Sequence, residues 1–253
     1  MKKLYLIYLA LFLIACEKDE LPIEKHIMGD ISSYQIQQTV YENQIFYNLK
    51  SNTAIKENLT TDWDLAFEAS EQGWKILINS SRYSDVTEFE NYNFEDEITQ
   101  NEINNAEKKW DNPKGLDYGT AFGNYMQKNS IYVLNRGYNI DGTLSGYKKI
   151  FIDSVNTEYY SIIYSDLDNS NTRTIQVPKD SSTNFQYLSI NTNSIMNLEP
   201  NKNDWDLLFT PYTTLYNDPE TPPSYLVRGV LTNYLNGVLV AKDSLRIFED
   251  INY

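Results

Sequence analysis

The sequence predicts an all-β fold, arranged as an antiparallel meander or sandwich-like domain with at most one or two short helices. The chain of 253 residues contains 21 Tyr and 10 Phe, and aromatic residues suit the pleated, half-buried surface of a sheet. Short stretches of alternating polar and apolar residues recur between turn residues. They show no strand-helix-strand rhythm, so we expect antiparallel and not parallel sheets.

The N-terminus predicts export and lipid attachment. Lys2 and Lys3 precede an apolar stretch over residues 4–14, which is typical of a signal peptide and shorter than the roughly 20 residues of a membrane-spanning helix. The run Leu-Ile-Ala-Cys then ends at Cys16, the one cysteine of the chain. This run resembles the lipobox of bacterial lipoproteins, so we expect a signal peptide over residues 1–15 and acylation of Cys16. The alternative is an ordinary signal peptide with an incidental cysteine.

Residues 16–30 predict an acidic tether between the lipid and the domain. The run Glu-Lys-Asp-Glu at residues 17–20 resembles the export signal of Bacteroidetes lipoproteins, which predicts an outer-membrane lipoprotein that faces the cell exterior. A charged, solvated linker is the alternative interpretation. No linker rich in Pro, Gly or Ser interrupts residues 31–253, and we expect them to form a single β domain.

The charge of the chain argues against nucleic acid as a partner. Asp and Glu number 35 against 21 Lys and Arg, which gives a net charge of −14. Such a chain repels phosphate backbones, so no nucleic acid partner is expected.

The alternation predicts individual strands and three hairpins. The strands are expected over residues 34–41, 44–49, 75–79, 131–134, 147–152, 159–164, 172–177 and 225–231. Turn residues then predict that 131–134 pairs with 147–152, that 159–164 pairs with 172–177, and that 225–231 pairs with 238–241. Residues 84–109 are acidic and lack β periodicity, which predicts a surface excursion with one helix around 95–109.

A hexapeptide motif occurs twice, as Asp-Trp-Asp-Leu-Ala-Phe from residue 62 and as Asp-Trp-Asp-Leu-Leu-Phe from residue 204. Strand periodicity would place the Trp, Leu and Phe of each copy on one face and both Asp on the other. We expect the aromatic residues to be core anchors of equivalent strands and the aspartates to cap the preceding loops, although paired carboxylates also suit acid/base chemistry. The residues concerned are Trp63, Asp64, Phe67, Trp205, Asp206 and Phe209.

Around these motifs the sequence resembles the HmuY family, surface heme-binding lipoproteins of Bacteroidetes with an all-β fold. The resemblance covers most of the mature chain: the strand before the first motif, the first motif with residues 75–79, and the second half from Tyr187 through 210–214 to 225–231. It implies that the chain binds heme or a related porphyrin for iron acquisition and passes it to a TonB-dependent outer-membrane receptor.

The heme ligands of that family are only partly matched. Heme is held there between two axial side chains, histidines or methionines, but the one histidine here, His26, lies in the expected tether. The resemblance points instead to the Gly- and aromatic-rich residues 118–126, where Met126 or Tyr118 could ligate iron, since tyrosinate is an axial ligand in some heme proteins. The alternative is a module of the same fold that binds a glycan, peptide or protein without heme.

No enzymatic activity is expected. With one histidine and one cysteine, both near the N-terminus, the chain lacks the residues for a Ser-His-Asp or Cys-His site and for a Cys/His zinc site. A pair of carboxylates, as in glycosidases, is the one catalytic arrangement that so acidic a sequence leaves open. No metal is expected beyond the heme iron.

Overall fold

The computed structural model describes residue 35 and residues 42–216 and 223–240, which belong to one compact unit, Tyr34–Tyr253. The predicted signal peptide, the predicted acylation site Cys16 and the predicted tether lie outside the described residues, as does the expected strand over 34–41 apart from residue 35. Within the described part, no helix has the length and apolar character needed to cross a membrane.

The chain is mostly β. Its described residues form three antiparallel sheets, one short α-helix and several 3-10 turns, and they do not close into a barrel. The predicted all-β fold class is therefore confirmed.

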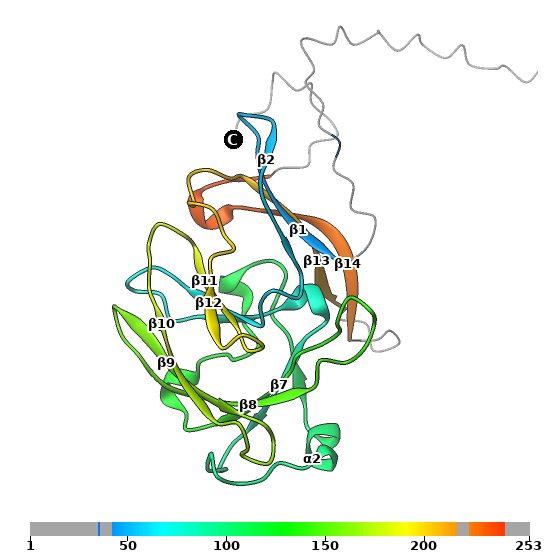
Figure 1. Ribbon diagram of the computed structural model, residues 1–253, viewed down its shortest axis with the longest axis vertical. Coiled ribbons are helices and arrows are strands. Elements are labelled where there is room, and N and C mark those ends of the chain that lie inside the picture. The colour runs from blue at the N-terminus through cyan, green and yellow to red at the C-terminus, as the bar shows by residue number, and fades with distance from the viewer. Residues whose placement is uncertain (1–34, 36–41, 217–222, 241–253) are drawn as a thin grey trace, which may run out of the picture. The chain divides into compact units, whose positions relative to one another are not determined.

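Three sheets make up the domain, and we name them A, B and C (Figure 1). Sheet A has the strand order β14-β13-β1-β2 and comprises β1 (Asn43–Asn48), β2 (Thr53–Leu59), β13 (Leu207–Leu215) and β14 (Ser224–Thr232). Sheet B has the order β12-β11-β3-β4 and comprises β3 (Leu65–Glu68), β4 (Ile76–Ile78), β11 (Phe185–Ser189) and β12 (Ser194–Met196). Sheet C has the order β10-β9-β8-β7-β5-β6 and comprises β5 (Asp85–Phe89), β6 (Lys108–Lys109), β7 (Ile131–Asn135), β8 (Tyr147–Val155), β9 (Tyr159–Ser165) and β10 (Arg173–Pro178).

Two of the three predicted hairpins are confirmed, and one is wrong. β7 pairs with β8 and β9 pairs with β10, as expected. β14 does not pair with residues 238–240, which form no strand; it pairs with β13 instead. The reason is that the 3-10 turn Tyr234–Asn236 follows β14 and ends at Gly237 in the left-handed region, with a φ of 84°.

The expectation that residues 84–109 lack strands is also wrong. They contain β5 and β6, and the helix α2 is short, spanning only Gln100–Asn105. β5 shows no alternation because it lies inside sheet C between β6 and β7, and four of its five residues are buried. The other one, Glu88, is paired with Lys109 at 2.6 Å and Lys128 at 2.8 Å.

Sheets A and B are built from two copies of one four-strand unit. The first repeat comprises β1 to β4 and the second β11 to β14, and in each repeat the third strand begins within the hexapeptide motif. Sheet A joins the first hairpin of the first repeat to the second hairpin of the second repeat, and sheet B joins the other two hairpins. The central pairs have matching registers, with Tyr47 opposite Leu207 and Leu188 opposite Leu65.

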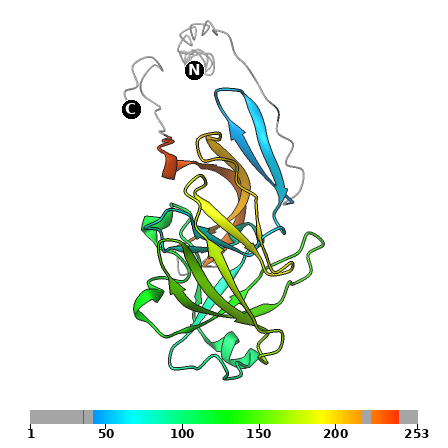
Figure 2. The same ribbon diagram turned by 60° about the vertical axis from the view of Figure 1, so that its left-hand side comes forward.

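The two repeats therefore exchange hairpins about a pseudo-twofold axis. β1 and β13 are hydrogen-bonded neighbours although they lie near opposite ends of the described chain, and Figure 2 shows the blue hairpin beside the orange strands. The segment between the repeats supplies every strand of sheet C. The central strands β1, β3, β11 and β13 consequently contribute equivalent residues from the two repeats to the interface of sheets A and B.

The core is layered around sheet B. One face of sheet B packs on sheet C through residues such as Leu65, Phe67 and Ile150. The opposite face of sheet B carries Trp63 and Ala66, which belong to a separate cluster. The far face of sheet C is covered by α2 and its flanking residues, in a cluster formed by Phe89, Ile98, Ile103, Ile131 and Val133.

Candidate functional site

In each hexapeptide motif the strand begins only at the fourth residue, so the tryptophan precedes it. The tryptophan therefore lies on the opposite face of the sheet from the one that strand periodicity predicts. β3 begins at Leu65, so Trp63 and Asp64 precede it. Trp63 packs with Ala66 on one face of sheet B, whereas Leu65 and Phe67 pack on the other. The expectation that Trp63, Leu65 and Phe67 share a face is wrong, because the two-residue periodicity holds only within a strand.

The second copy repeats this geometry. Trp205 packs edge-on against Phe46, with ring centroids 4.9 Å apart, and Phe209 packs against Tyr47 at 5.8 Å. Phe46 lies opposite Leu208 in sheet A, and adjacent residues of a strand point to opposite faces. Trp205 therefore shares a face with Leu208 and not with Phe209. The matching contact in sheet B joins Trp63 to the ring at position 187, at 5.1 Å.

Two asparagines hold the tryptophan turns in place. The Asn79 side-chain amide donates to the carbonyl oxygen of Trp63 at 2.7 Å, and the Asn233 amide donates to that of Trp205 at 2.9 Å. Both asparagines follow the fourth strand of their repeat and begin a 3-10 turn. The spacing of the repeated motif does not reveal these asparagines, since 154 residues separate this pair whereas 142 separate the two tryptophans.

The aspartates at the centre of the motifs also bind equivalent groups. The Asp64 carboxylate accepts from the backbone N–H of Ile190 at 2.8 Å, and the Asp206 carboxylate accepts from that of Leu49 at 2.7 Å. Each donor lies just beyond the strand that pairs with the motif strand. The expectation that Asp64 and Asp206 cap the loops before them is therefore wrong; Asp62 does so in the first copy, accepting from the N–H at position 59 at 2.9 Å.

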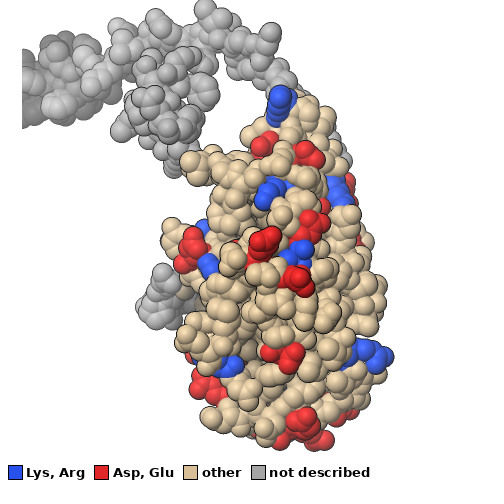
Figure 3. Space-filling model, turned by 90° about the vertical axis from the view of Figure 1, so that its left-hand side faces the viewer, with Lys and Arg blue, Asp and Glu red and all other residues tan. Residues whose placement is uncertain are grey.

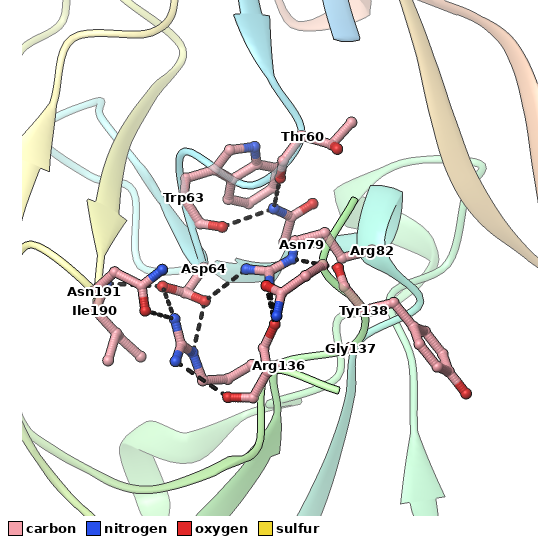
Figure 4. A network of polar contacts seen from close by, with 12 residues as sticks. Thr60, Trp63, Asp64, Asn79, Arg82, Arg136, Gly137, Tyr138, Ile190 and Asn191 are labelled. Carbon is pink, nitrogen blue, oxygen red and sulfur yellow. Dashed lines mark hydrogen bonds and ion pairs between the residues drawn. The ribbon is translucent and has the colours of Figure 1, made fainter. Parts of the chain in front are cut away.

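In the first copy, two arginine side chains also bind the central aspartate (Figure 4). Asp64 Oδ1 accepts from Arg82 Nη1 at 3.2 Å and from Arg136 Nε at 2.9 Å, and Asp64 Oδ2 accepts from Arg136 Nη2 at 3.2 Å. With the N–H of Ile190, four donors satisfy the carboxylate completely. The side chains of Asp64 and Arg82 are each 1 % exposed and that of Arg136 is 7 % exposed.

This buried cluster carries one negative and two positive charges. Burial lowers the pKa of Arg82, Asp64 opposes that shift, and Arg136 adds to it. Further acceptors spread the positive charge, because Arg82 Nε donates to the carbonyl oxygen of Tyr138 at 3.0 Å and Arg136 Nη2 donates to Asn191 Oδ1 at 2.6 Å. The cluster links sheet B, which carries the first motif, to sheet C through one carboxylate. Its role is therefore structural.

A cavity of about 430 Å³ lies between sheets A and B. Its wall takes equivalent residues from the two repeats, namely Phe46 and Tyr187, Trp63 and Trp205, and Ala66 and Leu208. Both indole N–H groups are occupied, since Trp63 Nε1 donates to Gln44 Oε1 at 2.7 Å and Trp205 Nε1 donates to Glu199 Oε1 at 3.2 Å. The rings therefore present apolar surface to the cavity.

Two buried carboxyl groups stand next to this region. Burial raises the pKa of Asp111 to about 7, although the backbone N–H groups of Ala121 and Ile78 donate to it at 2.7 and 2.8 Å. Burial likewise raises the pKa of Glu199 to about 7, against donors that include the N–H of Asn184 at 3.0 Å. In the described part of the chain neither carboxyl group forms an ion pair.

The candidate heme ligands lie elsewhere. Tyr118 is 65 % exposed and Met126 is 50 % exposed, and neither lines the cavity between sheets A and B. Between them, Phe122 and Tyr125 are buried and hold the loop in the core. The Lys114 ammonium lies 5.8 Å from the centre of the Tyr118 ring.

Charges of both signs are mixed on one face of the molecule (Figure 3). On the face in Figure 3, basic side chains stand among the acidic ones, so the excess of negative charge is not gathered into one patch there. Among the residues with described positions, no group of three or more His, Cys, Asp or Glu side chains could hold a metal ion. Comparisons with protein-family models, with curated proteins and with solved structures find no match for this chain.

Proposed function

We propose that the chain is a non-catalytic, HmuY-like binding domain, held on the outer face of the outer membrane by lipid on Cys16, and that its ligand is heme or a related porphyrin. The observation that carries the proposal is the placement of Tyr118 and Met126 as exposed side chains on one loop. Phenolate oxygen and thioether sulfur are both axial ligands of heme iron. The loop can therefore offer an iron ligand without disturbing the core.

The chemistry around the loop fits such a ligand. Phe122 and Tyr125 anchor the backbone on both sides of Gly123, so Tyr118 and Met126 are presented from a fixed base. The ammonium group of Lys114 beside Tyr118 would attract the carboxylates of a porphyrin. The resemblance to the HmuY family supports the same region, and a TonB-dependent receptor would be the partner that receives the heme.

Titration of the purified protein with hemin tests the proposal. We expect a Soret shift that saturates at one equivalent, and its loss or displacement when Tyr118→Phe or Met126→Leu removes the ligating atom. Tyr225→Phe is the matched control, because Tyr225 is 56 % exposed on β14 and should leave the spectrum unchanged. A spectrum indistinguishable from free hemin would overturn the proposal.

A second candidate function is ligand binding without heme. It is favoured by the aromatic cavity between the two repeats, which neither Tyr118 nor Met126 lines. A protein that shows no Soret shift but binds another ligand would support this function. Neither candidate predicts turnover of a substrate.

A further inference from the structure

The cavity between sheets A and B has a buried end and an open end. Trp63, Ala66 and Trp205 are wall residues that are at most 7 % exposed, whereas Lys114 and Tyr234 are wall residues that reach the surface, Tyr234 with 39 % of its area exposed. Protein cores normally contain few voids larger than a water molecule. A cavity of about 430 Å³ instead falls within the range of small-molecule sites, about 300 to 1,000 Å³.

The buried end suits an apolar body. Its polar side chains are already bonded, since Gln44 Oε1 accepts from Trp63 Nε1 at 2.7 Å and Gln44 Nε2 donates to Thr210 Oγ1 at 2.9 Å. Asn58 Oδ1 has no partner among the described residues, but its accessible surface is below 1 Å² and a ligand cannot reach it. The surface that remains is aromatic and aliphatic, which attracts a ligand through burial of apolar area.

The open end carries two hydrogen-bond donors. Lys114 forms no ion pair within the described part of the chain. The next residue, Gly115, lies against Tyr234, because a Cβ atom added to it would be 2.9 Å from the Tyr234 hydroxyl oxygen. That hydroxyl accepts from the backbone N–H of Leu116 at 2.8 Å, which leaves its own proton for another acceptor. An ammonium group and a hydroxyl group together suit the two oxygens of a carboxylate.

The acidic groups near Lys114 do not oppose such a ligand. Asp111 and Lys114 are the charged residues of the wall. Burial raises the pKa of Asp111 to about 7, so a neighbouring anion holds this group in its neutral form at little cost near neutral pH. Asp117, three residues after Lys114, is paired with Lys75 at 2.9 Å. The charge that a ligand meets at the open end is therefore positive.

We propose that this cavity binds an amphiphile of the fatty-acid class. The apolar chain lies between the two repeats, and the carboxylate binds Lys114 and the Tyr234 hydroxyl. The proposal deepens the second candidate function, ligand binding without heme, and rests on it. The site shares Lys114 with the surroundings of the proposed heme loop but uses neither Tyr118 nor Met126.

Fluorescence of cis-parinaric acid, a fatty acid that brightens in apolar sites, tests the proposal with the full chain at pH 7. We expect saturable binding at one equivalent. Its methyl ester has the same chain without the charge and should bind about tenfold more weakly, the loss expected for one hydrogen bond to a charged group. This comparison needs no variant and so does not depend on how well a variant folds.

Two variants then place the carboxylate. Lys114→Met and Tyr234→Phe should each weaken binding of the acid while leaving that of the ester unchanged. Lys50→Met is the matched control for Lys114→Met, because Lys50 is exposed in the turn after β1 and lies outside the wall. Binding of the acid should also persist when Tyr118→Phe and Met126→Leu are combined.

The outcomes separate this proposal from the functions proposed above. Absence of saturable binding of both probes would overturn it together with the second candidate function. Equal affinity for the acid and the ester, or unchanged binding of the acid by Lys114→Met, would overturn the carboxylate site and leave an apolar ligand site in the cavity. The Soret shift with hemin reports iron ligation, so its presence or absence decides the heme proposal alone.

Discussion

Replacing Asp64 with asparagine should lower the free energy of unfolding by about 3 to 5 kcal/mol, the range found when one partner of a buried ion pair is removed. The change leaves Arg82 and Arg136 buried without a counter-charge. It also places an amide group where the carboxylate accepted four hydrogen bonds. Urea denaturation followed by tryptophan fluorescence measures the effect.

Asp206→Asn is the matched control. Asp206 occupies the equivalent position of the second repeat and accepts from the N–H of Leu49, but no described basic side chain forms an ion pair with it. Asparagine can still accept that hydrogen bond, so we expect a loss below about 1.5 kcal/mol. Equal losses in the two variants would show that the arginines do not depend on Asp64.

The free energy of unfolding should fall as the pH rises from about 4 to about 7. Burial raises the pKa of Asp111 from 3.8 and that of Glu199 from 4.5, each to about 7. Between about pH 4 and pH 7 the folded state keeps protons that the unfolded state has released. The stability that the two groups contribute is therefore greatest below about pH 4 to 5 and is lost as the pH rises through 7. At about 1.4 kcal/mol per pKa unit, the ionisation of each group lowers the free energy of unfolding by about 3 to 4 kcal/mol.

Glu88 contributes in a different pH range. Burial opposes its ionisation, but hydrogen bonds from Lys109, Lys128 and Ser130 prevail and lower its pKa to about 2. Its stabilising effect is therefore present above pH 4.5 and is lost only in stronger acid. The measurement is urea denaturation at pH 5, 6, 7 and 8, where Glu88 stays ionised.

Variants identify the groups behind this pH dependence. Asp111→Asn and Glu199→Gln should each flatten the decline, whatever constant offset they add to the stability. Asp117→Asn, at a side chain that is 89 % exposed, should leave the slope as it is. A protein equally stable at pH 5 and pH 8 would contradict the assignment.

The local part of the fold could be predicted from the sequence. β7 with β8, and β9 with β10, are neighbours along the chain and are joined by turns with a clear residue signature, so each hairpin leaves its full pattern within one short segment. β2 left no such pattern. Only Asn58 is buried among its seven residues, so it shows no alternation of apolar residues.

The long-range part could not be predicted. The repeated motif indicated equivalent strands, but not that the two repeats exchange hairpins, because strand pairing across the chain leaves no local trace. The partners of Asp64 were missed for the same reason, since Arg82 and Arg136 lie 18 and 72 residues away. Comparison with the second motif does not indicate these arginines either, because the equivalent residue Asp206 has no described ion-pair partner.

The exchange of hairpins determines the order in which the chain can fold. Sheet C is assembled largely from contacts between sequence neighbours and can form as soon as β10 has been synthesised. β1 and β3 have to wait for β13 and β11, and loop closure over such distances is slow. We therefore expect a late kinetic phase in which sheets A and B close together. The apolar faces of the first repeat stay without their partner strands until the second repeat has been synthesised.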